Sequence, residues 1–300
     1  MTSSPYFDTP PFSPESFTAL DGVEFSAHAY DIDSGAVLFS HQPDLELGTA
    51  SVPKVFLLYS ALAMVRDGEL SLDEKLRRRP SERVADSGLW YLLQQDSLSV
   101  FDIGMLIGAV SDNFATNVLA RRVGLDRVHR DTAALGYTSS GLHDYLRWPR
   151  PAGAPARLSS GTAAELSDFM AGVSRDAFFD ESLSEVLRRW LGAGTDTSMV
   201  ASAFDPDPLA HYEYDRGAWV VNKTGTNGTI RADIGIAMTR EKRIAYAVIA
   251  NWETGTDRVR EVMPIMRRAG EAIHEALLPG SYPGTARAHE TASTTDEGTR

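Results

Sequence analysis

The chain has 300 residues, of which 43% are hydrophobic, with no cysteine and a formal net charge of −12. It is long enough for one large domain, or two closely packed subdomains, with a full core. The negative charge argues against nucleic acid or an anionic membrane as a partner, since both require basic surfaces. Without cysteine there is no disulfide framework, thiolate zinc site or cysteine nucleophile, and no apolar run approaches the length of a membrane span.

Residues 1–20 predict an N-terminal arm rather than a targeting signal. The segment from Met1 to Ala19 contains four prolines and two acidic residues but no lysine or arginine. It therefore lacks the basic and apolar segments of a secretory signal. We expect a cytoplasmic protein, or a secreted one if a signal has been trimmed.

A β-hairpin is expected directly after the arm. Apolar and polar residues mix from Val23 to Tyr30 as in a strand, Asp31 to Gly35 supplies turn residues, and Ala36 to Ser40 indicates a second strand. The short connection implies that the two strands are antiparallel.

Ser51 and Lys54 stand at the start of an apolar run, Val55 to Tyr59, which predicts a buried helix. Positions i and i+3 share a helix face, so the serine hydroxyl could lie within hydrogen-bond reach of the lysine amine. The N-terminal end of a helix favours a developing oxyanion and a lysine shifted toward its neutral form. These are the properties of an activated serine nucleophile.

The Ser-x-x-Lys pattern is weak by itself, because a helix cap followed by a solvated lysine is its commoner explanation. The chain has 29 basic residues, and only those at positions 54, 75, 223 and 242 are lysines. Lysine can lose its proton when it is buried, whereas arginine effectively cannot. A lysine beside an apolar run therefore favours the catalytic interpretation.

The segment after this helix has two parts. Leu70 to Arg79 is charged and predicts a surface loop, and Asp86 to Tyr91 combines a turn with two aromatic residues. Trp90 could form one wall of a substrate cleft and bind substrate. It could also pack in the core, which is the commoner place for an aromatic side chain.

The middle of the chain is predicted to be helical. Ser99 to Asp102 resembles a capping box that opens a helix ending near Val110. Ser111-Asp112-Asn113 lies between this helix and the next, Phe114 to Val123, where a simple N-cap would also explain it. Further helices are expected over Arg127 to Leu135, Ser160 to Val173 and Ser182 to Leu191, with a Pro-rich loop over Leu146 to Pro155.

Beyond Pro206 the pattern becomes extended. Three strands are expected over Ala218 to Lys223, Thr229 to Met238 and Ile244 to Trp252, then a helix over Arg258 to Leu278 and a disordered tail over 281–300. With the hairpin this makes five strands. We expect an α+β fold in residues 21–280, with a five-stranded antiparallel sheet flanked by helices (21–47 and 205–280) and an all-helical lobe (48–204).

Lys223-Thr224-Gly225-Thr226 ends the first of these three strands. Gly225 allows a ligand to approach the backbone closely, and Thr226 offers an N–H at the sheet edge. A lone Lys-Thr-Gly is most simply a turn after a strand. However, Ser-x-x-Lys, Ser-Asp-Asn and Lys-Thr-Gly in this order, separated by about 60 and then 110 residues, rarely occur together by chance.

This trio resembles the signature of class A β-lactamases and penicillin-binding proteins. The resemblance extends from about Val23 to Leu278, and it includes Ser-Gly-Leu at 87–89 and Ser-Asp-Asn-x-Ala-x-Asn at 111–117. It implies the β-lactamase and transpeptidase fold. It also implies a serine hydrolase that forms an acyl-enzyme and needs no metal or cofactor.

The same resemblance implies the catalytic roles. Ser51 would be the acylated nucleophile and Lys54 its proton acceptor. Ser111 would relay a proton to the leaving nitrogen, and Asn113 would hold the substrate amide. The backbone N–H groups of Ser51 and Thr226 would form the oxyanion hole.

A carboxylate on the substrate would be bound, by the same resemblance, by Lys223, Thr224 and Ser111. Arg231, on the neighbouring strand, would be a second carboxylate anchor. It could equally form a structural ion pair with Asp233 or another nearby acid, since such pairs are common and often do little.

One departure concerns deacylation. Class A enzymes carry Arg-Trp-Glu-Pro, whose glutamate activates the water that releases the acyl group, whereas this chain has Arg-Trp-Pro at 147–149. Asp144, Glu165 and Asp168 are the nearest carboxylates, and none matches the motif. We therefore expect intact acylation and slow deacylation.

The expected activity is hydrolysis of a carboxylate-bearing β-lactam, amide or ester by a monomer acting on a small molecule. One alternative is a cytoplasmic esterase or acyltransferase of a biosynthetic pathway. Another is a β-lactam or peptidoglycan-fragment binding protein without turnover. A cell-wall DD-peptidase fits less well, because its substrate lies outside the membrane.

Overall fold

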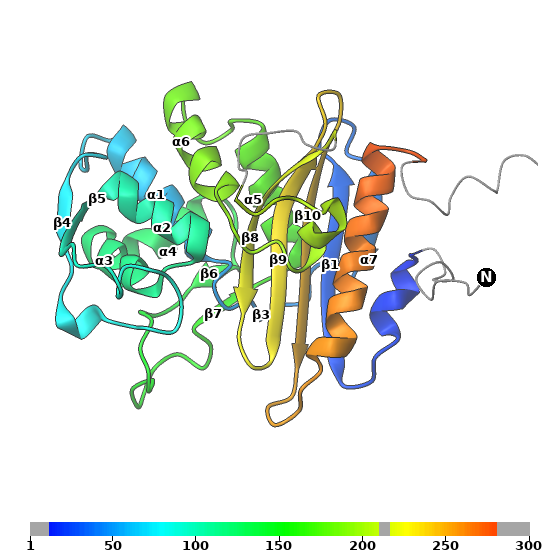
Figure 1. The fold of residues 1–300 in the computed structure, drawn as a ribbon, viewed down its shortest axis with the longest axis horizontal. Helices are drawn as coiled ribbons and strands as arrows, with labels where there is room; N and C mark the ends of the chain where they lie inside the picture. Colours follow the sequence, from blue (N-terminus) through cyan, green and yellow to red (C-terminus); the bar gives the residue numbers. More distant parts are fainter. Residues whose placement is uncertain (1–11, 210–216, 281–300) are drawn as a thin grey trace, which may run out of the picture.

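The computed structural model describes residues 12–209 and 217–280, and its largest element is a five-stranded antiparallel sheet (Figure 1). The strands lie in the order β2-β1-β10-β9-β8, and every neighbouring pair is antiparallel. Their bounds are β1 Val23–Asp31, β2 Val37–His41, β8 Trp219–Thr226, β9 Ile230–Met238 and β10 Arg243–Trp252. The predicted α+β fold, with its hairpin and three late strands, is confirmed.

The sheet is covered on both faces. Alternate residues of a strand point to opposite sides, so a central strand contributes to two separate core clusters. In β10, residues 245, 247 and 249 pack into the larger core cluster, on the side of the helical region. Residues 244, 246, 248 and 250 pack into a second cluster with α7, Val259–Leu277. A run of apolar residues therefore serves as a central strand between two layers.

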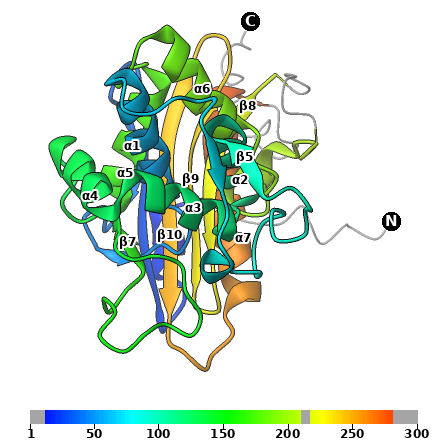
Figure 2. The same cartoon turned by 90° about the vertical axis from the view of Figure 1, so that its left-hand side faces the viewer.

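Six helices lie on the side of the sheet opposite α7 (Figure 1). They are α1 Lys54–Arg66, α2 Val100–Val110, α3 Asn113–Val123, α4 Leu125–Ala134, α5 Ala163–Ser174 and α6 Glu181–Gly192. Viewed from the helical side, α1, α2 and α3 stand in front of the sheet (Figure 2). Each helix predicted from apolar periodicity is present, with ends shifted by a few residues.

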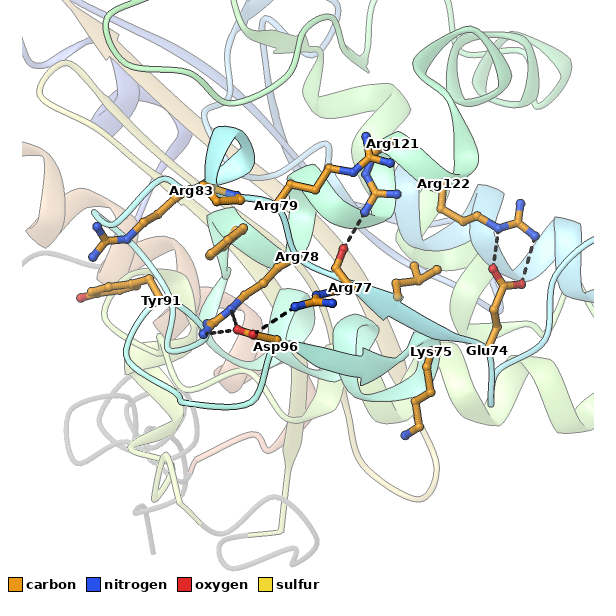
Figure 3. Close-up of a pocket in the computed structure, with 13 residues that line it drawn as sticks. Glu74, Lys75, Arg77, Arg78, Arg79, Arg83, Tyr91, Asp96, Arg121 and Arg122 are labelled. Atoms are coloured by element: carbon orange, nitrogen blue, oxygen red, sulfur yellow. Dashed lines mark hydrogen bonds and ion pairs between the residues drawn. The ribbon is translucent and has the colours of Figure 1, made fainter.

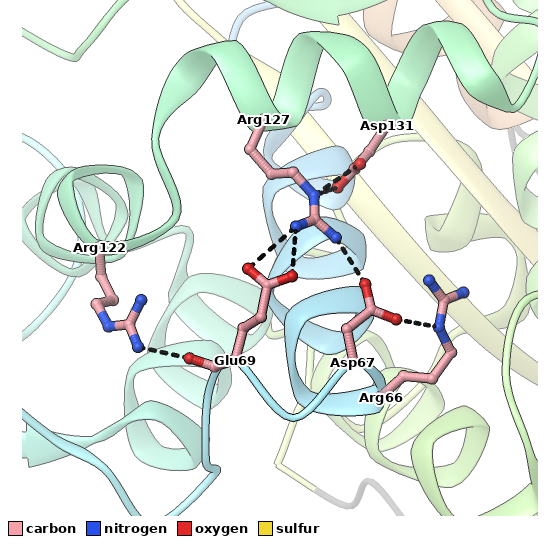
Figure 4. A network of polar contacts seen from close by, with 6 residues as sticks. All are labelled: Arg66, Asp67, Glu69, Arg122, Arg127 and Asp131. Carbon is pink, nitrogen blue, oxygen red and sulfur yellow. Dashed lines mark hydrogen bonds and ion pairs between the residues drawn. The ribbon is translucent and has the colours of Figure 1, made fainter.

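Helix α1 forms the middle of the helical layer. Its residues from Lys54 to Met64 are all buried, so it is apolar on every side, as expected for a helix surrounded by others. An ion-pair network fixes its C-terminal end, where Arg127 of α4 binds Asp67 at 2.9 Å, Glu69 at 3.2 Å and Asp131 at 2.8 Å (Figure 4). Packing and this network together hold α1 in place.

The prediction of a surface loop over Leu70 to Arg79 is wrong in its second half. Residues Lys75–Arg77 form a short strand, β4, that pairs with β5, Ser97–Ser99. The side chain of Leu76, in the middle of β4, is buried, so the short strand packs against the core. A second small sheet joins β3, Leu47–Gly48, β7, Ser159–Gly161, and β6, Gly141–Leu142.

The described part of the N-terminal arm packs against the sheet. Pro14–Thr18 forms a short 3-10 helix, and its Phe17 is buried with its ring 5.3 Å from that of Phe25 and 5.9 Å from that of Phe39. The rest of the arm, residues 1–11, and the predicted disordered tail, 281–300, lie outside the described residues. The domain boundaries stay a prediction. No helix in the described ranges is long and apolar enough to cross a membrane.

Candidate active site

Ser51 lies in the tight turn that leads into α1, three residues before the helix begins. The turn has 3-10 geometry, because Val52 N donates to Thr49 O at 3.1 Å and Lys54 N donates to Ser51 O at 3.4 Å. Ala50, just before the serine, has a positive φ of 48°. Such strained, non-glycine positions cluster at functional sites. The serine is therefore presented by a strained turn rather than by the helix itself.

Lys54 is almost fully buried and binds the Ser-Asp-Asn segment. Its Nζ donates to Ser111 O at 2.7 Å, to Ser111 Oγ at 3.1 Å and to Asn113 Oδ1 at 2.7 Å. Burial lowers the pKa of Lys54 well below its usual value, and the nearby charge of Lys223 lowers it further, whereas Asp112 and Asp86 oppose the shift. A lysine in this state can act as a proton acceptor.

The Ser-Asp-Asn segment caps a helix and contacts Lys54. Asp112 is the N-cap of α3, and its buried carboxylate accepts from Ala115 N at 2.8 Å and from Leu89 N and Trp90 N at 2.7 Å each. Ser111, with a φ of 53°, ends α2 and turns its hydroxyl to Lys54. The capping explanation thus holds for the aspartate, and its two neighbours face the candidate base.

Strand β8 brings the third motif to the serine. Gly225 lies so close to the turn of Ser51 that a Cβ there would be 2.0 Å from Thr49 O and 3.0 Å from Ser51 N. Only glycine allows this approach, and the close neighbour is the protein's own turn, whereas the sequence had suggested a ligand. The Lys-Thr-Gly strand therefore lies directly against the nucleophile turn.

Lys223 is buried in β8, and its Nζ donates to Thr224 O at 2.8 Å. Burial lowers the pKa of Lys223 to about 8, although the carboxylates of Asp196 and Asp233 partly oppose this shift. Behind it, burial raises the pKa of Asp233 to about 7 while Asn222 donates to its carboxylate at 3.0 Å. With a pKa of about 8, Lys223 can carry its charge near neutral pH.

The three motifs meet at a cavity of about 280 Å³. Its lining residues are Ser51, Asp86, Ser87, Gly108, Ala109, Val110, Ser111, Asn113, Gly194, Thr195, Asp196, Asn222, Lys223, Thr224 and Thr226. Asp86 and Asp196 were missed by the sequence reasoning. Asp86 precedes the Ser-Gly-Leu motif and accepts from Asn113 Nδ2, so a signal was available. Asp196 lies in an irregular segment and carried no such signal.

Trp90 and Arg231 are not among the described residues that line this cavity. Trp90 is fully buried with its ring 5.6 Å from that of Phe114, so its proposed role in substrate binding is wrong and the core interpretation holds. Arg231 donates to Asn227 O at 2.6 Å and Ile230 O at 2.7 Å, with its guanidinium 5.8 Å from the Trp252 ring. Burial lowers the pKa of Arg231, and the carboxylates of Asp196, which lines the cavity, and Asp257 oppose this shift.

The loop without the glutamate also lies apart from the cavity. Asn117 fixes its start, donating to Leu146 O at 2.7 Å and accepting from Leu146 N at 2.9 Å. Trp148, next to the proline, is 87% exposed. Glu165 accepts from Thr138 N at 2.8 Å and Asp168 from Tyr137 at 2.9 Å, so both carboxylates have structural partners.

A larger cavity, of about 880 Å³, lies beside β4 and is lined mainly by arginines (Figure 3). Four of its lining arginines are engaged with acids: Arg77 and Arg78 bind Asp96 at 3.8 and 3.1 Å, Arg122 binds Glu74 at 2.7 Å, and Arg121 binds Glu82. Its described lining contains none of the motif residues. Size alone therefore does not identify the site, whereas the convergence of the three motifs does.

The sequence profile described as "Beta-lactamase enzyme family" matches residues 15–277. The chain belongs to this family. It is accordingly a β-lactamase-like serine hydrolase, as the motif trio implied. Among curated proteins no relative matches at a significant level.

Solved structures agree on the fold. A β-lactamase from Sphaerobacter thermophilus is 22% identical with a TM-score of 0.74, and the match covers 85% of this chain and 92% of that one. PBP-A is 16% identical with a TM-score of 0.75, covering 89% and 98%. A PBP-A variant solved as an acyl-enzyme with penicillin G is 18% identical with a TM-score of 0.73, covering 89% and 98%.

Within residues 12–209 and 217–280, no group of three or more His, Asp or Glu side chains is arranged to hold a metal ion. The chemistry of the motif residues is that of a nucleophile, a base and hydrogen-bond donors.

Proposed function

We propose that Ser51 attacks the carbonyl carbon of a small β-lactam, amide or ester and is acylated. The supporting observation is the placement of Lys54, whose buried Nζ lies 3.1 Å from Ser111 Oγ at the entrance of the turn that carries Ser51. As the Oγ–carbon bond forms, the hydroxyl proton passes to Lys54. Ser111 then transfers its proton to the leaving nitrogen or oxygen as the bond to the carbonyl carbon breaks, and it regains a proton from Lys54, which returns to its neutral form.

The oxyanion that develops is stabilised, in this proposal, by the N–H groups of Ser51 and Thr226. Thr226 lines the cavity, and the close approach of Gly225 to Ser51 N brings the end of β8 beside the serine. Each such donor is worth about 3 kcal/mol in acyl transfer. In this proposal Asn113, whose side chain accepts from Lys54 and donates to Asp86, binds the amide of the substrate.

Release of the acyl group is proposed to be slow. The described lining of the cavity contains no residue of the loop from 146 to 155 and no glutamate. This observation favours a second candidate function, in which the protein binds a β-lactam or a peptidoglycan fragment covalently with little turnover. An esterase or acyltransferase would use the same acyl-enzyme with a different donor or acceptor.

Intact-protein mass spectrometry tests the proposal. The protein is mixed with penicillin G, a chromogenic cephalosporin or a small chromogenic ester, and product is followed over minutes to hours. An adduct that persists with about one equivalent of product supports slow deacylation. Many turnovers support a working hydrolase. Ser51→Ala should abolish both signals, and an adduct that survives this substitution refutes the assigned nucleophile.

A further inference from the structure

Asp196 occupies an unexpected position in the active site. Thr224 Oγ1 donates to Asp196 Oδ2 at 2.7 Å, and both residues line the cavity. Thr224 is one of the groups expected to bind the carboxylate of a substrate. The threonine hydroxyl is thus already engaged by a carboxylate that belongs to the protein.

The Asp196 side chain is held firmly in this place. Its second oxygen, Oδ1, accepts from Ser198 Oγ at 2.7 Å and from Ser198 N at 3.2 Å. Its backbone carbonyl accepts from Asn222 Nδ2 at 3.2 Å. The neighbouring Thr195 donates through both N and Oγ1 to Ala109 O, which ties the segment to α2. A substrate would have to break several of these contacts to displace the carboxylate.

Cations at this end of the cavity do not outweigh the acids. Lys223 is the single lysine or arginine among the described lining residues, and its Nζ donates to Thr224 O. Arg231 donates to the carbonyls of Asn227 and Ile230 and is not a lining residue, although Asp196 and Asp257 act on its charge. Asp86 accepts from Asn113 at the Lys54 end, so at the Lys223–Thr224 end of the described lining one ammonium, Lys223, faces one carboxylate, Asp196.

We infer that Asp196 selects against acyl donors with a carboxylate at the Lys223–Thr224 end of the cavity and favours donors with an ammonium group there. The inference rests on the proposed acylation of Ser51. A carboxylate of the substrate would face Asp196 at a short distance, whereas an N–H donor with positive charge would find an acceptor in it. Neutral donors should lie between the two.

Three chromogenic esters with the same acyl chain test this inference. Their chains end in a dimethylammonium group, a methyl group or a carboxylate, and the second-order rate of acylation is measured from the first turnover and from the mass of the adduct. The native protein should prefer the ammonium ester to the carboxylate ester by at least about tenfold, which corresponds to about 1.4 kcal/mol. A preference for the carboxylate ester overturns the inference.

Asp196→Asn should reduce this preference by about tenfold or more, chiefly by accelerating the carboxylate ester. The matched control is Glu241→Gln, which removes one negative charge at the exposed β9–β10 turn, at the opposite end of the strands from Thr226. It should leave the preference unchanged. An unchanged preference in Asp196→Asn overturns the inference, and so does an equal change in both variants.

Different results would refute the proposed acylation of Ser51 and the proposed role of Asp196. If none of the three esters gives an adduct that depends on Ser51, both the acylation and the inference are refuted. If adducts form but the order of the three rates is reversed, only the role of Asp196 is refuted. Should Asp196→Asn fold poorly, the order of rates in the native protein and their dependence on salt still decide, because screening weakens a preference based on charge.

Discussion

A lysine-containing motif lies at each end of the cavity, with Lys54 at one end and Lys223 at the other. The two ends differ in the side chains that contact these motifs. At one end Lys54 contacts Ser111 and Asn113, so its side-chain partners are residues of another motif, and Asn113 in turn donates to Asp86. At the other end Thr224 contacts Asp196, which belongs to no motif. The motifs thus define the reacting atoms, whereas a residue outside them controls the charge that a substrate meets.

The two lysines show the same contrast in their protonation. Burial lowers the pKa of both, but the pKa of Lys54 falls well below the usual value, and that of Lys223 falls to about 8. Lys54 has a second cation nearby, whereas Lys223 has Asp196 and Asp233. One lysine is therefore suited to accept a proton, and the other to remain charged near neutral pH.

Replacing the base should have the largest effect. Lys54→Met removes the proton acceptor without burying a new charge, and we expect the acylation rate to fall by about 10³-fold. The rate is measured as adduct formation by intact mass. Lys75→Met, at an exposed position outside the active site, should change it by less than about twofold. Equal effects of the two substitutions would contradict the role of Lys54.

The second-largest effect is expected when the contact between β8 and the turn of Ser51 is widened. In Gly225→Ala the added Cβ meets Thr49 O at 2.0 Å, so the strand must move away from Ser51. We expect a destabilisation of about 1–3 kcal/mol in chemical denaturation and a loss of about 100-fold in acylation rate. In Gly228→Ala the Cβ meets nothing within 4 Å, so this control should retain both properties.

The carboxylate behind Lys223 should give stability an unusual pH dependence. The pKa of Asp233 is raised to about 7, while its unfolded value is near 3.9, so the folded state binds more protons between these values. Stabilisation by this group is complete below pH 4 and is lost as the pH rises through 7.

Asp233→Asn tests that dependence. Between pH 4 and 7 the native protein should lose, relative to the variant, up to about 4 kcal/mol of unfolding free energy. Urea denaturation at several pH values measures the difference. The substitution also removes a negative charge near Lys223, so the pKa of that lysine should fall. A stability difference that does not change with pH would show that Asp233 is ionised throughout.

The smallest effect is expected at Arg231. Its contacts with Asn227 O and Ile230 O lie outside the cavity, so Arg231→Gln should change the rate of acylation by a carboxylate ester by less than about threefold. Stopped-flow measurement of the first turnover checks this. A tenfold loss would mean that the arginine turns into the cavity when an anionic substrate binds, and the two ends would then differ less than proposed.

The sequence alone determined the main elements and the motifs. Alternating and helical periodicity are local properties, so the helices and the strands of the five-stranded sheet could be predicted to within a few residues. The motifs Ser-x-x-Lys, Ser-Asp-Asn and Lys-Thr-Gly have fixed internal spacing, and together they predicted which segments would meet. Glycine at position 225 was expected to let a ligand approach, whereas its close neighbour is the turn of Ser51.

Only the tertiary structure decided the surroundings of these residues. Trp90 packs in the core against Phe114, which is distant in the sequence. Arg231 binds a backbone carbonyl of the turn that precedes its own strand. Asp196 reaches Thr224 because the segment after α6 is tied to α2 and Asn222, and no periodicity or motif encodes such contacts. Long-range packing therefore places the charge in the cavity, and with it the proposed preference among substrates.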